Sequence, residues 1–378
     1  MQFVRYFVLL LPLLTQMQAS SENTVCKKCH PVIYAEYQSS MHQKASIFND
    51  PVHKAVWDRH PDRQKKNYKC AKCHTPADHT LLAKKGLPQN NDIQNNEPIS
   101  CRTCHTIEHI QEHSTSNSNV YSKKKKYFYS ADQAKKGEKI KFKEHSSFLG
   151  LIKRPSGSPY HTIDYSNENF YNGNVCMGCH SHKRNGKGFM VCDLEVKQGH
   201  SKETCISCHM PKVKGSLANQ KESATHAYHG INLHRLNPEI LSKYIKLSIQ
   251  PNAEGFTLAL KNEATHTLFP QPLRQAQVRI EIERDGKTID VPVRTFSRSI
   301  GTQGKPAMPW LADTVLKDTT IKAHETRLLS YAIPLKKGDT VLVEFGYTMV
   351  NPKAAKKLGI TDPDATRFTV LTKAHFPI

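Results

Sequence analysis

The chain has 378 residues, and its 54 Lys and Arg residues outnumber its 33 Asp and Glu residues to give a formal net charge of +21. Charge of this size would suit a nucleic-acid partner, but the amino-terminal segment excludes that class because it directs the chain out of the cytoplasm.

Residues 1–20 have the layout of a secretory signal peptide. Arg5 precedes an apolar stretch from Phe7 to Leu14, and small or polar residues follow it. The stretch is too short to span a bilayer. An uncleaved anchor is the alternative, because Met17 fits poorly at the small position before cleavage at Ala19. We therefore expect a periplasmic protein, or one that is secreted or at the cell surface, with no transmembrane segment in the mature chain.

Five copies of the motif Cys-x-x-Cys-His follow in residues 21–240. This motif is typical of covalent haem c attachment. Two cysteines one turn apart can reach the two vinyl groups of one porphyrin, and the adjacent histidine can bind its iron from the proximal side. The copies are Cys26/Cys29/His30, Cys70/Cys73/His74, Cys101/Cys104/His105, Cys176/Cys179/His180 and Cys205/Cys208/His209.

Zinc binding and disulfide formation also use pairs of cysteines. Neither requires a histidine directly after every pair, so we predict five covalently attached haem c groups. Cys192, the eleventh cysteine, belongs to no motif. We expect it to be a small buried residue, with a reactive thiol as the alternative.

The distribution of haem-ligating residue types predicts two domains. All eleven cysteines and 18 of the 21 histidines precede Pro238, near which we place the boundary. Residues 21–240 show few long amphipathic patterns, so we expect short helices and loops around haems whose faces supply much of the apolar core.

Residues 241–378 alternate apolar and polar side chains at a period of two, as half-buried strands do. Asp285-Gly286 is a favoured hairpin turn, and Pro292 after it favours an edge strand. The predicted facing pairs are Ile282 with Ile289, Ile280 with Val291, and Val278 with Val293. A second pair of strands is predicted on either side of a turn at Lys336–Asp339. The predicted fold class is α+β, with an immunoglobulin-like β-sandwich in residues 241–378.

Several stretches resemble the multihaem family of the c-554 type tetrahaem cytochrome and hydroxylamine oxidoreductase, over most of residues 24–235. They are Ser39–His42, Ile99-Ser100, Ser158–Cys176, Met210-Pro211 after the fifth motif, and His226–Gly230. This resemblance implies His42, His161 and His226 as distal iron ligands. Asn262–Pro270 resembles an Asn-x-x-x-x-His element of β-domains appended to such cytochromes, which implies His266 as another.

A fifth distal ligand is left open among the remaining histidines, and we favour His145. The others are His60, His79, His113 and His200. Methionine is the competing type of distal ligand. Sixteen histidines remain after the five in the motifs, so we expect mostly bis-histidine, low-spin haems.

A haem with histidine on both sides passes electrons without binding substrate. We therefore predict an electron carrier of anaerobic respiration, with no catalytic residue. Its redox partners would be a quinol-oxidising or dehydrogenase donor and a terminal reductase. The alternative is an oxidoreductase that acts on nitrite, hydroxylamine or tetrathionate at one haem with an open position. A third possibility is a filament or outer-surface conduit assembled through the β-domain. The sequence leaves the oligomeric state open.

Overall fold

The computed structural model describes residues 22–147, 152–196, 203–219, 223–231 and 241–378. The predicted signal peptide, the predicted boundary at Pro238 and the candidate ligand His200 lie outside these ranges. Among the described residues, no helix has the length and apolar character needed to cross a bilayer.

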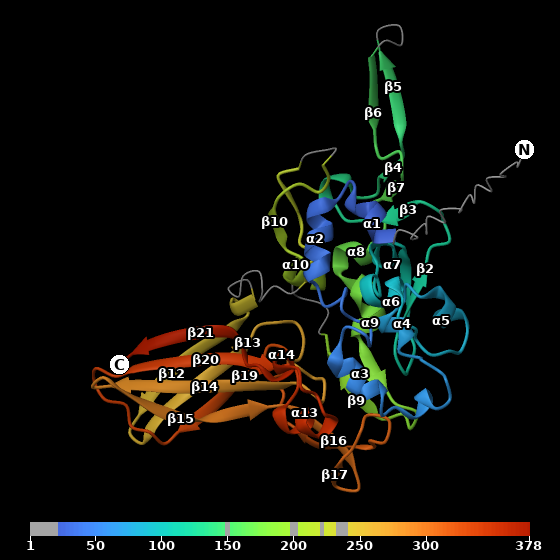
Figure 1. Ribbon diagram of the computed structural model, residues 1–378. Coiled ribbons are helices and arrows are strands. Elements are labelled where there is room, and N and C mark those ends of the chain that lie inside the picture. Colours follow the sequence, from blue (N-terminus) through green and yellow to red (C-terminus); the bar gives the residue numbers. More distant parts are fainter. Residues whose placement is uncertain (1–21, 148–151, 197–202, 220–222, 232–240) are drawn as a thin grey trace, which may run out of the picture.

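Short helices dominate the amino-terminal half (Figure 1). They are α1 (Glu22–Lys27), α2 (Pro31–Ser39), α3 (Pro51–Trp57), η1 (Pro61–Arg63), α4 (Ala71–His74), α5 (His79–Ala83), α6 (Asp92–Asn96), α7 (Cys101–His105), η2 (Gln133–Lys135), α8 (Asn169–Asn172), η3 (Asn174–Cys176), α9 (Met177–His180) and α10 (Cys205–His209).

Small separate sheets connect these helices. β1 (Ile107–Gln111) pairs with β2 (Ser118–Tyr121), and β7 (Thr162–Asp164) lies between β3 (Tyr127–Tyr129) and β4 (Lys139–Ile140). β8 (His182–Arg184) pairs with β9 (Met190–Asp193), and β10 (Lys212–Lys214) with β11 (Thr225–Ala227). β5 (Lys143–Ser147) and β6 (Ile152–Ser156) form a hairpin that projects away from the helices in Figure 1.

Polar caps fix where the motif helices begin. The Ser100 side chain accepts a hydrogen bond from the Thr103 amide at the start of α7, and Thr204 forms a capping box with Ser207 at the start of α10. Such caps satisfy amides that have no partner inside the helix. Each of these helices ends at its motif histidine.

Two sheets form the carboxy-terminal half, in the strand orders β12-β13-β19 and β15-β14-β20-β21. The strands are β12 (Ile245–Asn252), β13 (Gly255–Asn262), β14 (Gln275–Arg284), β15 (Lys287–Phe296), β19 (Thr326–Tyr331), β20 (Thr340–Thr348) and β21 (Thr369–Pro377). Phe256 and Leu258 of the first sheet and Val278 and Phe345 of the second belong to one core, and all four are fully buried. Two short helices, α13 (Pro352–Leu358) and α14 (Pro363–Thr366), precede β21.

The predicted Asp285-Gly286 hairpin forms, and β15 with its Pro292 is an edge strand as predicted. Two of the three predicted facing pairs are confirmed. The third is wrong because a β-bulge between Val278 and Ile280 shifts the register, so that Val278 faces Arg294. Val293 therefore points outward and is 49 % exposed.

The strands flanking Lys336–Asp339 also form, but they do not pair with each other. β19 pairs with β13, while β20 pairs with β14 and β21. The turn therefore carries the chain from one sheet to the other. Alternation along a strand shows which side chains are buried together, but it does not identify the partner strand.

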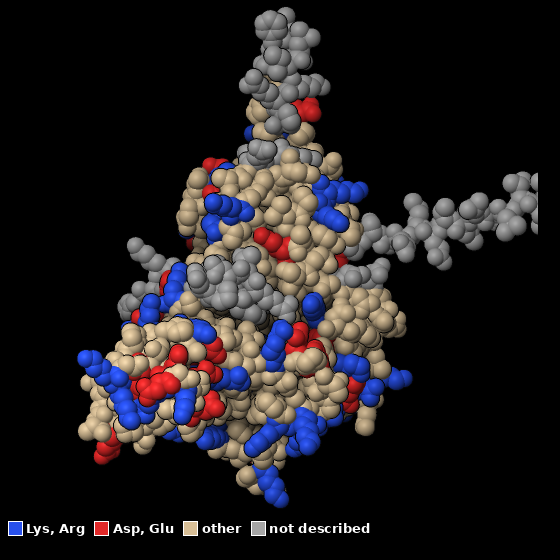
Figure 2. Space-filling model, turned by 60° about the vertical axis from the view of Figure 1, so that its left-hand side comes forward, with Lys and Arg blue, Asp and Glu red and all other residues tan. Residues whose placement is uncertain are grey.

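A third sheet, inserted between β15 and β19, extends toward the helices. It contains β16 (Arg298–Thr302), β17 (Lys305–Pro306) and β18 (Thr314–Asp318). Ile300 and Ala312 pack there against Val191 of β9. The surface is basic, and Lys and Arg side chains are spread over the lower part of the face shown in Figure 2.

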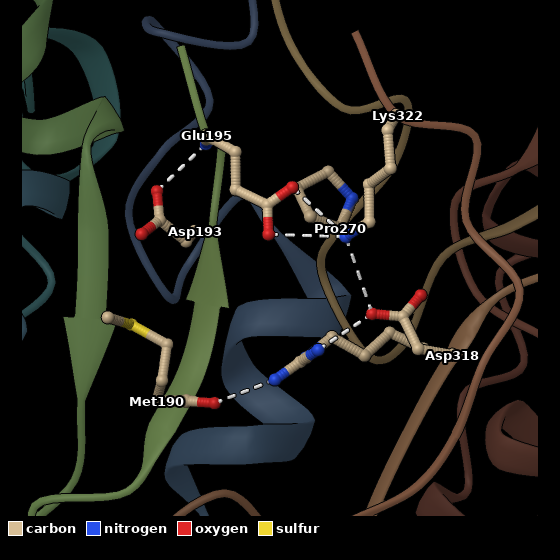
Figure 3. A pocket seen from close by; sticks show the side chains of 7 residues that line it. Met190, Asp193, Glu195, Pro270, Asp318 and Lys322 are labelled. Carbon is tan, nitrogen blue, oxygen red and sulfur yellow. Dashed lines mark hydrogen bonds and ion pairs between the residues drawn. The ribbon is translucent and has the colours of Figure 1, made fainter. Parts of the chain in front are cut away.

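Charged side chains hold the two halves together around a cavity of about 80 Å³ (Figure 3). Lys322 Nζ lies 3.0 Å from Glu195 Oε2 and 3.6 Å from Asp318 Oδ2. Arg298 bonds Asp318 at 2.8 Å and donates to the Met190 carbonyl oxygen at 3.1 Å. These charges satisfy one another, so the cavity is part of the joint between the two halves.

Candidate haem sites

Each of the five motif histidines faces a second histidine. The separations between ring centres are 6.2 Å for His30 and His161, 3.9 Å for His74 and His53, 6.2 Å for His105 and His229, 6.1 Å for His180 and His42, and 6.4 Å for His209 and His266.

Four of these separations match the space that an axially ligated iron needs. An iron about 2 Å from each ligating nitrogen, with about 1.1 Å more to each ring centre, would separate two imidazole centres by about 6.2 Å. The four pairs at 6.1–6.4 Å therefore fit an iron between their rings. The residues present fit haem, which would supply a reversible one-electron couple at each such pair.

Backbone carbonyl groups orient several of these rings. His30 Nδ1 lies 2.8 Å from the Leu217 carbonyl oxygen, and His105 Nδ1 lies 2.7 Å from that of Tyr129. Because a carbonyl only accepts, each Nδ1 carries the proton and Nε2 keeps a lone pair for a metal. His229 Nδ1 contacts a carbonyl in the same way on the opposite side of its pair.

Burial favours the neutral, ligating form of these imidazoles. Burial first, and then the facing His180, lower the pKa of His42 to about 4. Burial first, and then the facing motif histidine His105, likewise lower the pKa of His229 to about 4. In an apolar setting the charged ring loses more solvation than the neutral one.

The His74–His53 pair is different, because its rings are too close for an iron between them. His53 Nε2 lies 3.3 Å from the Tyr68 hydroxyl, and both rings of the pair lie near the Ala45 carbonyl oxygen. Burial, and secondarily His74, lower the pKa of His53 to about 3.

The motifs themselves lie next to one another. None of the eleven cysteines, all of which are described, forms a disulfide. Thiols from different motifs are instead in contact, and they are Cys26 with Cys101, Cys73 with Cys179, and Cys176 with Cys205. Motif 1 therefore lies beside motif 3, and motif 4 lies beside motifs 2 and 5.

Further contacts fix this packing. The Asn23 side-chain oxygen accepts a hydrogen bond from the Cys101 amide at 2.9 Å and so ties α1 to α7. In motif 4, a Cβ at Gly178 would come within 1.8 Å of the Asn119 side-chain oxygen. Only glycine therefore allows β2 to approach α9 this closely.

Three of the histidines singled out in the sequence, His42, His161 and His266, lie opposite motif histidines. His226 does not. Its Nδ1 lies 3.0 Å from the Gly215 carbonyl oxygen and its Nε2 lies 2.9 Å from Glu36 Oε1, so neither nitrogen is left for a metal.

His229 occupies the position opposite His105 that the sequence assigned to His226. Both histidines belong to the His226–Gly230 element, so the correct segment was identified but the ligand within it was not. Strand β11 ends at Ala227, and His229 lies in the bend beyond it, which alternation in the sequence could not show.

His145 also lies away from the motifs. It is exposed on the projecting β5–β6 hairpin, where its Nε2 bonds the Ser156 hydroxyl at 3.1 Å (Figure 1). The ring opposite His74 belongs to His53, which the sequence analysis did not single out. Its one local signal is Asp50, which caps α3 by accepting from the His53 amide and so fixes the position of this histidine.

The remaining sequence candidates have other roles. His60 caps η1 through its ring nitrogen and stacks on Trp57. His113 is exposed, and His79 begins α5. Cys192 is half-buried on β9, and burial raises the pKa of its thiol, which disfavours the reactive thiolate.

Comparisons with known proteins agree with this arrangement. The profile of the family "Cytochrome c554 and c-prime" matches residues 25–106. The fold is similar to the crystal structure of a penta-haem cytochrome c552 from Thermochromatium tepidum, with a TM-score of 0.68 and 20 % identity. The similarity covers 95 % of this chain and 99 % of that one. A search of curated proteins finds no match.

Proposed function

Because this chain is a multihaem c-type cytochrome that transfers electrons, we propose that it binds five covalent haems and carries electrons between two redox partners. The observation that carries the proposal is the set of four histidine pairs spaced 6.1–6.4 Å apart. Closed coordination on both sides suits electron transfer and excludes substrate from the iron. Intact-mass spectrometry of the holoprotein should show five added haems, and a smaller number would refute that count.

The contacts between motifs support a continuous path for electrons. Motif 4 is central, since its Cys176 touches motif 5 and its Cys179 touches motif 2. Cys104 of motif 3 is close enough to both of these cysteines to influence their pKa values. Motif 1 joins the array through motif 3.

We assign the protein to the periplasm or the cell surface, and its partners to a respiratory donor and a terminal reductase. The signal-peptide pattern and the absence of catalytic side chains at four closed sites support this assignment. The carboxy-terminal strand order, with three strands in one sheet and four in the other around one core, favours an immunoglobulin-like sandwich.

This sandwich would complete one haem site through His266, which faces His209 of motif 5. His266→Ala should therefore convert one haem per chain from low spin to high spin, seen as a new ferric signal at about g = 6 in electron paramagnetic resonance. The matched control is His375→Ala, which removes an exposed histidine from the same domain. An unchanged His266→Ala spectrum would contradict the interdomain ligand.

A second function, reduction or oxidation of a small nitrogen or sulfur compound, is favoured by one observation. The His74–His53 pair is only 3.9 Å apart, and the Tyr68 hydroxyl bonds His53, so motif 2 is the site where a distal position could stay open. A high-spin signal in the wild-type protein that shifts with nitrite or hydroxylamine, and disappears in a variant lacking His74, would favour the enzyme. A wild-type spectrum that is entirely low-spin would refute it.

A further inference from the structure

Four lysines surround motif 2. Lys65 and Lys69 both approach Asp62, at 3.8 Å and 3.4 Å, and their side chains are 72 % and 70 % exposed. Lys72 is exposed within the motif itself, and Lys183 is exposed on β8. We call these four lysines the lysine face.

Two elements far apart in the sequence contribute to the lysine face. The thiol contact between Cys73 and Cys179 brings motif 4 onto motif 2, and Lys183 follows Cys179 by four residues. Lys183 and Lys72 both act on the Cys73 thiol electrostatically and lower its pKa. The positive charges therefore lie over the thiols that join these two motifs.

This charge is only partly compensated. Asp62 is shared between Lys65 and Lys69. Within the described ranges, no carboxylate lies within ion-pair distance of Lys72 or Lys183. Lys and Arg side chains are also prominent in the lower part of Figure 2, at the height of α3 and β16 in Figure 1.

An aromatic and apolar patch adjoins the lysine face. Trp310, from the loop between β17 and β18, packs edge-on against His60 with ring centres 4.7 Å apart. His60 is itself within electrostatic reach of Lys65, Lys69 and Lys183. Leu311 beside Trp310 is 49 % exposed. Charged residues around an aromatic and aliphatic centre are typical of a protein-docking surface.

Motifs 1 and 5 are more covered. The Asn219 side chain and amide bond the carbonyl oxygens of Lys28 and Cys29 in motif 1, both at 2.9 Å. In motif 5, Cys208 Sγ lies 3.3 Å from the Tyr244 hydroxyl. Motif 2 thus combines uncompensated lysines with an exposed apolar side chain.

We propose that the lysine face, with Trp310 and Leu311, docks an acidic electron-transfer protein that exchanges electrons at motif 2. This inference rests on the proposed carrier function and assigns it a point of entry. In each encounter the reduced partner loses one electron and one ferric iron becomes ferrous. Long-range attraction speeds the encounter of such proteins, and salt weakens it.

The test compares two double variants that change the net charge equally. Lys65→Glu/Lys183→Glu alters the lysine face and leaves the motif residues intact. Lys287→Glu/Lys337→Glu alters exposed positions on two turns at the far end of the sandwich. The probe is an acidic plant-type [2Fe–2S] ferredoxin. Its oxidised form is titrated to measure binding, and its reduced form is mixed anaerobically to measure the rate of electron transfer.

At an ionic strength of about 0.01 M the face variant should lose roughly tenfold or more in association rate and affinity, whereas the control should change little. At about 1 M the difference should vanish. Equal losses in both variants would overturn the proposal, because only net charge would matter. An equal slowing of reduction by dithionite would also overturn it, since a small anion needs no docking surface.

The low-spin spectrum of each variant separates this inference from the carrier function. If both variants keep the wild-type haem content and low-spin signals but bind ferredoxin equally, only the docking site is refuted. If the wild-type protein itself lacks low-spin haems, the carrier function fails first.

Discussion

Replacing Asn262 by Ala should remove the support of the loop that presents His266. The Asn262 side chain is fully buried at the end of β13. It donates to the carbonyl oxygens of His266 at 3.0 Å and Lys322 at 2.9 Å, and it accepts from the Ala264 amide at 2.9 Å. These three bonds fold residues 262–266 into a fixed turn.

The loss in stability follows from these contacts. Asn262→Ala leaves three backbone groups without their side-chain partner, and each unsatisfied buried group costs about 1–3 kcal/mol. We expect the carboxy-terminal domain to lose about 3 kcal/mol or more of its unfolding free energy. The His266 ring should also lose its fixed position opposite His209, which shifts the potential or spin state of that haem.

Denaturant unfolding monitored by strand circular dichroism measures the first effect, and electron paramagnetic resonance with redox titration measures the second. The matched control is Asn351→Ala. Asn351 caps α13 by accepting from the Lys353 amide at 2.9 Å, so its loss should cost about 1 kcal/mol and leave the haem spectrum unchanged. A destabilised Asn262→Ala protein with wild-type haem spectra and potentials would refute the positioning role.

Two other changes probe the histidine network and the sandwich. Glu36 accepts from the His226 ring and from the His229 amide at 2.8 Å, so Glu36→Ala should destabilise the fold by about 2 kcal/mol or more and raise the high-spin fraction by up to one haem per chain; wild-type spectra would argue against that brace. Arg284 lowers the pKa of Asp339 from 3.8 to about 2. This ion pair therefore stabilises the folded state above pH of about 4, and its contribution is lost as the pH falls through about 2. Asp339→Asn should flatten that part of the acid-unfolding curve, and an unaltered curve would exclude the ion pair as its source.

The sequence predicted the individual strands well because side-chain alternation is a local property. The Asp285-Gly286 turn, the alternation of β12 and β13 and the edge position of Pro292 all depend on neighbouring residues. Pairing across distance was less predictable. The bulge at Val278 and the separation of β19 from β20 depend on how two sheets share one core.

The same distinction holds for the haem sites. The covalent motifs are local, so their residues could be named from spacing alone. A distal histidine is defined only by what lies opposite it, and the rings of His53 and His229 come from segments whose direction is set by α3 and by the bend after β11. His226 has the sequence context of a ligand, yet Glu36, 190 residues away, occupies its Nε2.

The central claim is that motif histidines face second histidines across haem irons. Spin-quantified electron paramagnetic resonance of the ferric holoprotein tests it most directly. The four pairs at 6.1–6.4 Å predict at least four low-spin haems per chain. A spectrum in which two or more haems per chain are high-spin would contradict it.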